Sequence, residues 1–183
     1  ERARAVCRPR HGYPQRADDF AGKCQPTAVE FMERKVVALG ESFSGVQYPR
    51  PDAGSYILLT FDGHESEVNA NIERVRRLAL DNGAIDYIVL RSAEQAADIW
   101  KVRGALVMAV EAVSEQEPVD TWCRSATRRT CTLHQRAGGA SGMRMIAFGH
   151  AGDGNVHLCV VPRRPQPADM GARAARKHGA GLR

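Results

Sequence analysis

Two histidines on either side of a glycine-rich run are the residues of this sequence best suited to chemistry. His150 and His157 enclose the stretch 151–156, Ala-Gly-Asp-Gly-Asn-Val. Imidazoles are among the commonest ligands of divalent metals in proteins, and two of them can share one ion when they lie on adjacent strands. The spacing therefore suggests a metal site, and the alternative is a glycine-rich turn with two incidental histidines.

The residues around these histidines predict a β-hairpin. Residues 143–148 and 156–161 are mostly apolar, partly β-branched and free of proline, as strands usually are. The Gly-Asp-Gly-Asn run between them suits a tight turn with its tip near Asp153 and Gly154. In such a hairpin we expect the two histidines to face each other, with Cβ atoms about 4.5–5.5 Å apart.

A third candidate, Arg103, lies on the apolar face of a predicted helix. Ser92 and Gln95 have the spacing of a capping box, and the helix is expected to run to about residue 113. The other residues of that face are Ala96, Ile99, Leu106 and Val110. Arg103 can extend its head to water over an apolar stem, or it can hold a carboxylate bidentately in a cleft.

The remaining pattern predicts an α+β fold, with an antiparallel sheet and helices on one face. Residues 56–61 form the clearest strand, and a helix with an apolar stripe follows at Val68, Ile72, Val75 and Ala79. Asn82-Gly83 ends that helix, and residues 85–90 form another strand. Residues 28–32 fit either a buried strand or the start of a helix, and residues 40–54 are expected to be a long connection.

Length and composition fit one ordinary domain of 183 residues, 43% of them hydrophobic. No apolar run reaches the ~20 residues that would span a bilayer, so no transmembrane segment is expected. The five cysteines are odd in number and scattered, which predicts reduced thiols and a cytoplasmic location. The first residue is Glu1, so we expect the natural N-terminus to lie upstream.

The charge is unevenly distributed along the chain. Residues 26–120 carry nine Lys and Arg against sixteen Asp and Glu, whereas residues 1–25 and 121–183 are basic. The basic segments have no aromatic interleaving and no helical stripe, so nucleic acid is not an expected partner.

Three segments have no periodic pattern: 1–25, 121–140 and 162–183. We predict an irregular basic arm at 1–25, one domain at 26–161 that is degenerate at 121–140, and an irregular basic tail at 162–183. Our hypothesis for the abrupt changes at 1–25 and 121–140 is translation in a shifted reading frame.

Four runs together resemble one family. They are Ala28-Val29-Glu30-Phe31-Met32, Ile57-Leu58-Leu59-Thr60-Phe61-Asp62-Gly63, Ile99-Trp100-Lys101-Val102-Arg103 and Phe148-Gly149-His150-Ala151-Gly152-Asp153-Gly154-Asn155-Val156-His157. They occur in this order in the C-terminal cap domain of FAD-linked oxidases, the group of D-lactate dehydrogenase, the glycolate oxidase FAD subunit and 2-hydroxyglutarate relatives. The resemblance covers about residues 27–120 and 141–161.

The resemblance implies a ferredoxin-like antiparallel sheet that covers the flavin of a separate N-terminal FAD-binding domain, with no cofactor-binding residue in this chain. His150 and His157 match ligands of a divalent metal, expected to be zinc, and Arg103 matches the arginine that binds the substrate carboxylate. His178 is the nearest match to the catalytic, proton-accepting histidine. Lys177 stands where the family has a glutamate as third metal ligand, which weakens the metal site.

The resemblance implies a FAD-dependent dehydrogenase of a small D-2-hydroxy acid, such as lactate or glycolate, which passes hydride to flavin. Its partners would be the acid and a FAD-binding domain or subunit, and the chain alone is expected to be incomplete. Its location would be cytoplasmic, or peripheral to the inner membrane through partner subunits. The alternative is a non-catalytic α+β module that binds a small molecule or a protein.

Overall fold

A computed structural model of the chain describes residues 2–9, 24, 26–114, 119–122 and 144–161. The strands are β1 (Arg2–Pro9), β2 (Ala28–Glu33), β3 (Ser55–Asp62), β4 (Ala84–Leu90), β5 (Val119–Trp122), β6 (Arg144–His150) and β7 (Asn155–Val161). The helices are α2 (Arg34–Ser44), α3 (Glu65–Asp81) and α4 (Ala93–Val113).

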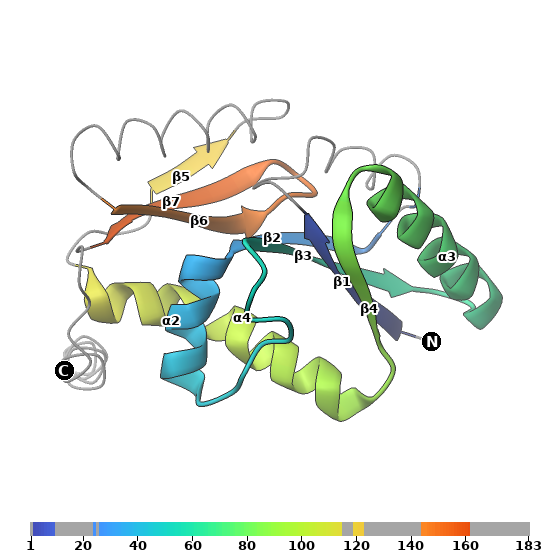
Figure 1. Ribbon diagram of the computed structural model, residues 1–183, viewed down its shortest axis with the longest axis horizontal. Coiled ribbons are helices and arrows are strands. Elements are labelled where there is room, and N and C mark those ends of the chain that lie inside the picture. The colour runs from blue at the N-terminus through green and yellow to red at the C-terminus, as the bar shows by residue number, and fades with distance from the viewer. Residues whose placement is uncertain (1, 10–23, 25, 115–118, 123–143, 162–183) are drawn as a thin grey trace, which may run out of the picture.

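The strands form one sheet in the order β4-β1-β3-β2-β6-β7-β5, and every neighbouring pair is antiparallel (Figure 1). The predicted α+β class with an antiparallel sheet is therefore confirmed. The hairpin of β6 and β7 joins the rest of the sheet through β2, where residues 30–32 pair with residues 148–150.

Apolar side chains fill both faces of the sheet, because successive residues of a strand point to opposite sides. Tyr56 and Leu58 of β3 pack with α2 and α4, whereas Ile57 and Leu59 pack with α3. Figure 1 shows α2 and α4 together below the sheet and α3 apart from them. The helices thus divide between the two faces of the sheet. The prediction that all of them cover one face is wrong in this respect.

Helix α2 was not predicted, and it supports α4 closely. Gly40 lies within α2, where a Cβ atom would come within 2.7 Å of Leu106 Cδ2 and 3.1 Å of the Val102 carbonyl oxygen. Only glycine allows the two helices to approach this far without displacing α4. Residues 40–44, expected to begin a long connection, instead complete α2 against the helix that carries Arg103.

The other predicted elements agree with the structure in most places. The strands predicted at 56–61 and 85–90 are β3 and β4, and the predicted stripe of α3 is buried. Ser92 caps α4 by accepting a hydrogen bond from the Gln95 N–H at 3.1 Å. Residues 28–32 are a strand, which resolves their ambiguity.

The ends of the chain differ from the expectation where they are described. Residues 2–9, placed by the sequence in an irregular arm, form β1 between β3 and β4. Thr121 and Trp122, placed in the degenerate segment, end strand β5. Residues 123–140 and the tail at 162–183 lie outside the described residues.

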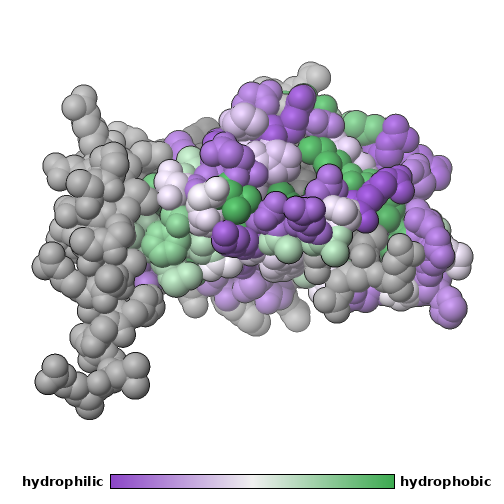
Figure 2. Space-filling view, turned by 90° about the horizontal axis from the view of Figure 1, so that it is seen from below, coloured by the Kyte–Doolittle hydropathy of each residue, from purple (hydrophilic) through white to green (hydrophobic). Residues whose placement is uncertain are grey.

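No described helix combines the length and apolar character that crossing a bilayer requires. The side chains of Cys24 and Cys159 are buried. Viewed from the side of α2 and α4, the surface mixes polar and apolar side chains (Figure 2), and α4 contributes the half-exposed Val107 and Met108.

A buried carboxylate organises the chain after α2. Glu41 accepts hydrogen bonds from Arg34 at 3.0 and 2.6 Å and from the Tyr48 backbone N–H at 2.8 Å. The hydrogen bond that Arg34 donates to Glu41 raises the pKa of Arg34, while the partial burial of Arg34 has the opposite effect. Glu41 therefore ties the start of α2 to the loop that follows its end.

We predict that Glu41→Ala lowers the free energy of unfolding by about 2–3 kcal/mol, because it leaves a part-buried guanidinium and a buried N–H without their acceptor. Glu73→Ala is the matched control, since Glu73 is exposed and meets Arg76 only at 3.7 Å. That control should change stability by less than about 0.5 kcal/mol. Urea unfolding measures both, and equal losses would contradict the role of Glu41.

Candidate functional site

The candidate site is built around the carboxylate of Glu30, which is only 4% exposed in the middle of the sheet. Arg103 donates from Nε and Nη2 to Oε2 of Glu30 at 3.1 and 2.8 Å. His150 Nδ1 lies 2.8 Å from Oε1, the other carboxylate oxygen. One buried carboxylate therefore links the predicted arginine to one of the two predicted histidines.

Strand pairing and helix packing bring these residues together from distant parts of the sequence. Glu30 pairs with His150 across β2 and β6, and with Leu58 across β2 and β3. Leu58 belongs to the core beneath α4, so Glu30 points to the same face of the sheet. Arg103 descends from α4 onto that face, and its side chain is 11% exposed.

The two histidines share a face but do not pair directly. His157 pairs with Phe148, and His150 pairs with Asn155. The prediction that the histidines stand opposite each other is therefore wrong, because the partner of His157 lies two residues before His150. They are diagonal neighbours, with ring centroids 6.0 Å apart, and His157 also packs on Phe148 at 5.2 Å.

Gly149 allows this arrangement at the end of the hairpin. It has φ of +151°, and a Cβ atom there would lie 2.5 Å from the Asn155 carbonyl oxygen. At the turn, Asp153 accepts a hydrogen bond from the Asn155 N–H at 2.9 Å, the Asx-type bond that the sequence predicts. The Gly152 N–H donates to the Val29 carbonyl at 3.2 Å, which fastens the turn to β2.

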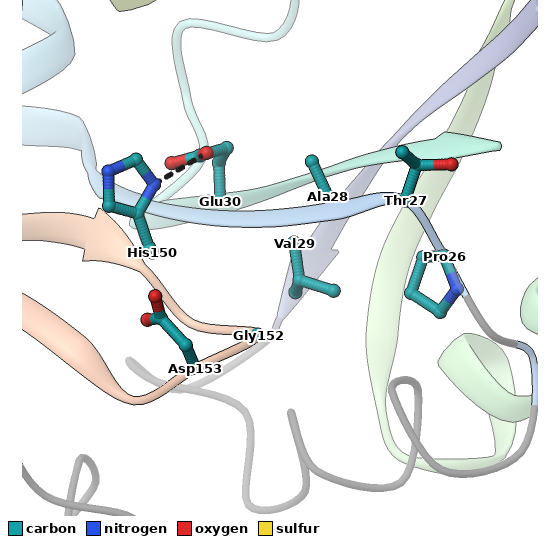
Figure 3. Close-up of a pocket in the computed structure, with 8 residues that line it drawn as sticks. All are labelled: Pro26, Thr27, Ala28, Val29, Glu30, His150, Gly152 and Asp153. Atoms are coloured by element: carbon teal, nitrogen blue, oxygen red, sulfur yellow. Dashed lines mark hydrogen bonds and ion pairs between the residues drawn. The ribbon is translucent and has the colours of Figure 1, made fainter. Parts of the chain in front are cut away.

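A pocket of about 290 Å³ opens beside His150 (Figure 3). Its walls come from the start of β2 and from the hairpin turn, and its lining residues are Pro26, Thr27, Ala28, Val29, Glu30, His150, Gly152 and Asp153. The His150 side chain is 48% exposed, and within the described part of the chain its Nε2 has no hydrogen-bond partner. The site can therefore offer a ring nitrogen to a small polar molecule.

The sequence identified Arg103, His150 and His157, and the structure brings all three to one face. It missed Glu30 as a site residue, because Glu30 appears there only within the run Ala28–Met32. The available signal was a single acidic residue inside the apolar run 28–32, since a charge in a buried strand needs a partner. His178, the predicted proton acceptor, lies outside the described residues.

The described residues do not by themselves fit a metal. No group of three or more His, Cys, Asp or Glu side chains among them could hold an ion. His150 and His157 supply two imidazoles, while the carboxylate of Glu30 is already engaged by Arg103 and His150. Among the eight residues that line the pocket there is also no Lys or Arg side chain to bind the pyrophosphate of FAD.

Tyr48 is a fully buried phenol near the ion pair. Burial raises its pKa far above the usual value, and nearby Tyr56 adds to the effect, while the positive charge of Arg103 opposes it. Its hydroxyl has no hydrogen-bond partner among the described residues. Tyr48 therefore stays neutral and serves as packing rather than as an acid.

A family comparison covers most of the chain. Residues 15–176 match the model of "FAD linked oxidases, C-terminal domain". The match also includes residues 15–26, 121–140 and 162–176, which lie outside the resemblance at 27–120 and 141–161.

Curated relatives agree with this match. A D-lactate dehydrogenase of Anaerostipes hadrus is 39% identical over 149 residues, which are 76% of this chain and 31% of that protein. A D-lactate dehydrogenase of Archaeoglobus fulgidus is 30% identical over 76% of this chain and 30% of its own length. Glycolate oxidase subunit GlcD of Escherichia coli K12 is 28% identical over 84% of this chain and 31% of its own length. The chain thus spans about a third of each relative.

Solved structures share the fold at low identity. 4-Ethylphenol oxidase from Gulosibacter chungangensis, in complex with isoeugenol, aligns with a TM-score of 0.55 and 13% identity, over 99% of this chain and 44% of that one. p-Cresol methylhydroxylase with substrate bound aligns with a TM-score of 0.58 and 10% identity, over 98% of this chain and 42% of that one. This likeness concerns the fold.

We predict that Gly149→Ala lowers the free energy of unfolding by more than about 2 kcal/mol, because the new Cβ would meet backbone atoms at an unfavourable φ. Gly152→Ala is the control on the same turn, since its Cβ would meet Val29 only at an ordinary 3.5 Å. Urea unfolding compares the two, and a tolerated alanine at 149 would refute the geometry.

We also predict that Tyr48 makes stability fall at high pH. Above about pH 10 the unfolded chain releases the phenolic proton while the folded chain retains it, so ionisation favours unfolding. Tyr48→Phe should match or exceed wild-type stability at pH 7 and lose less between pH 9 and 10.5. Urea unfolding over that range measures the difference, and identical pH profiles would contradict the assignment.

Proposed function

Because the chain belongs to the family of FAD-linked oxidase C-terminal domains, we propose that it forms the substrate-facing part of a dehydrogenase of small D-2-hydroxy acids, D-lactate or glycolate. The observation that carries this proposal is that Arg103 and His150 meet on one carboxylate of the sheet. A cation for the acid group and a ring nitrogen for the hydroxyl are thus held by the two oxygens of the same carboxylate.

Arg103 can bind the substrate carboxylate while it holds Glu30. Its Nε and Nη2 both donate to a single oxygen of Glu30, and within the described residues Nη1 has no acceptor. The Nη1–Nη2 edge of the guanidinium therefore remains for a second carboxylate, in the fork geometry that arginine favours. This edge would set the orientation of the hydroxy acid.

His150 would take the proton of the substrate hydroxyl through Nε2, the ring nitrogen that does not contact Glu30. A flavin held elsewhere in the protein would supply the two-electron acceptor that such an oxidation needs. His157 packs edge-on near His150 and would limit its rotation. The predicted zinc carries no step here, because the described residues supply two imidazoles and no third ligand.

We predict that this chain supports turnover when it replaces the corresponding third of the Anaerostipes hadrus D-lactate dehydrogenase. D-Lactate should reduce an artificial electron-accepting dye in that chimera. Arg103→Lys should lower kcat/KM about 100-fold, because lysine can neutralise Glu30 but cannot hold a carboxylate bidentately.

Lactamide, which lacks the carboxylate, is the matched substrate control. The wild-type chimera should prefer lactate strongly over lactamide, and the Arg103→Lys chimera should lose most of that preference. An active chimera whose preference is unchanged by the substitution would refute the role of Arg103, and no turnover of lactate or glycolate by a folded wild-type chimera would refute the function.

A further inference from the structure

Glu30 remains without a role in the proposed reaction, although it is the most deeply placed charge of the site. Its carboxylate lies on the central face of the sheet, and each oxygen has its own partner: Oε2 accepts from Arg103, and Oε1 meets His150 Nδ1. Burial of an ion this deep is costly unless every lone pair is used, so its presence needs an explanation.

The hydrogen-bond chemistry of the three groups fixes the direction of each bond. A guanidinium only donates, and an ionised carboxylate only accepts. With Arg103 beside it, Glu30 is a carboxylate that accepts from both sides, and the 2.8 Å contact with His150 needs a proton on Nδ1.

We propose that Glu30 is a positioning residue, which holds His150 as the tautomer with a proton on Nδ1 and an unshared electron pair on Nε2. In a neutral imidazole the two nitrogens have opposite roles, so the bond on one side determines the chemistry of the other. Free imidazoles populate both tautomers. The bond to Glu30 makes Nε2, the other nitrogen of His150, an acceptor.

The same carboxylate orients both groups of the site. The His150 ring is 48% exposed and would otherwise rotate about its side-chain bonds. Arg103 is 11% exposed and balances the charge of Glu30, so the carboxylate can orient His150 without leaving a net negative charge beneath the pocket. The separation of Arg103 from His150 is therefore set by the width of one carboxyl group. The catalytic meaning of this arrangement rests on the proposed function, whereas the tautomer does not.

The first test is made on the chain itself, without substrate or flavin. Nitrogen-15 NMR of the histidine side chains at about pH 8.5, where imidazoles are neutral, distinguishes the two tautomers. The signal of His150 is identified by its loss in His150→Gln. We expect Nδ1 to carry the proton, and a wild-type His150 with its proton on Nε2 would overturn the proposal.

The second test exchanges the carboxylate for an amide of the same shape. In Glu30→Gln, Arg103 still offers only donors, so the amide oxygen must face Arg103 and the amide NH2 must face His150 Nδ1. The tautomer of His150 should then reverse, with its proton on Nε2. Simple loss of stability would not produce this reversal, and an unchanged tautomer in a folded variant would overturn the proposal.

Glu33→Gln is the matched control, because Glu33 is also buried in β2 but lies on the opposite face of the sheet. It should leave His150 unchanged. Should Glu30→Gln fail to fold, the wild-type measurement still decides the question.

The tests of Glu30 and of the proposed function fail separately. In the chimera, Glu30→Gln should lower kcat about 10- to 100-fold, the usual effect of removing the orienting partner of a functional histidine. A proton on Nδ1 without turnover would preserve the role of Glu30 and reject the dehydrogenase. Turnover with the proton on Nε2 would support the dehydrogenase and reject the role of Glu30.

Discussion

The burial of one carboxylate constrains the whole site. Glu30 lies at the centre of a sheet whose both faces are packed, where an isolated negative charge would be strongly destabilising. Arg103 and His150 compensate it, and they come from a helix and a strand that are 73 and 120 residues away. The pairing of β2 with β6 and the position of α4 over the sheet must therefore be correct together, or Glu30 is left without a partner.

This constraint matters because the hairpin is joined to the rest of the sheet by few bonds. Within the described part of the chain, the pairing between β2 and β6 joins residues 30–32 to residues 148–150. Ser114 Oγ adds a hydrogen bond at 2.6 Å from the end of α4 to the Val160 carbonyl of β7. The contacts of Glu30 with Arg103 and His150 thus reinforce the short pairing between β2 and β6, beside the pocket. Stability and the geometry of the site depend on the same contacts.

The sequence predicted the elements whose pattern depends only on neighbouring residues. The stripe of α3 and the cap of α4 need no knowledge of distant residues, and both were found. Strand β1 has no such signal, since Arg2–Pro9 alternates arginine with small residues and gains its structure from pairing with β3 and β4. Glu30 was missed for the same reason, because its partners are remote in sequence.

The hairpin shows how a correct pattern can still give a wrong contact. The sequence places two strands around a glycine-rich turn, but the register follows from the turn at 151–154, across which His150 pairs with Asn155. His150 and His157 then become diagonal neighbours, with rings 6.0 Å apart. In this arrangement Nδ1 of His150 lies 2.8 Å from Oε1 of Glu30, while His157 packs on Phe148. If the two imidazoles were directly opposed across the strands, both would need the same position over the carboxylate of Glu30. The offset lets His150 contact Glu30 while His157 packs on Phe148.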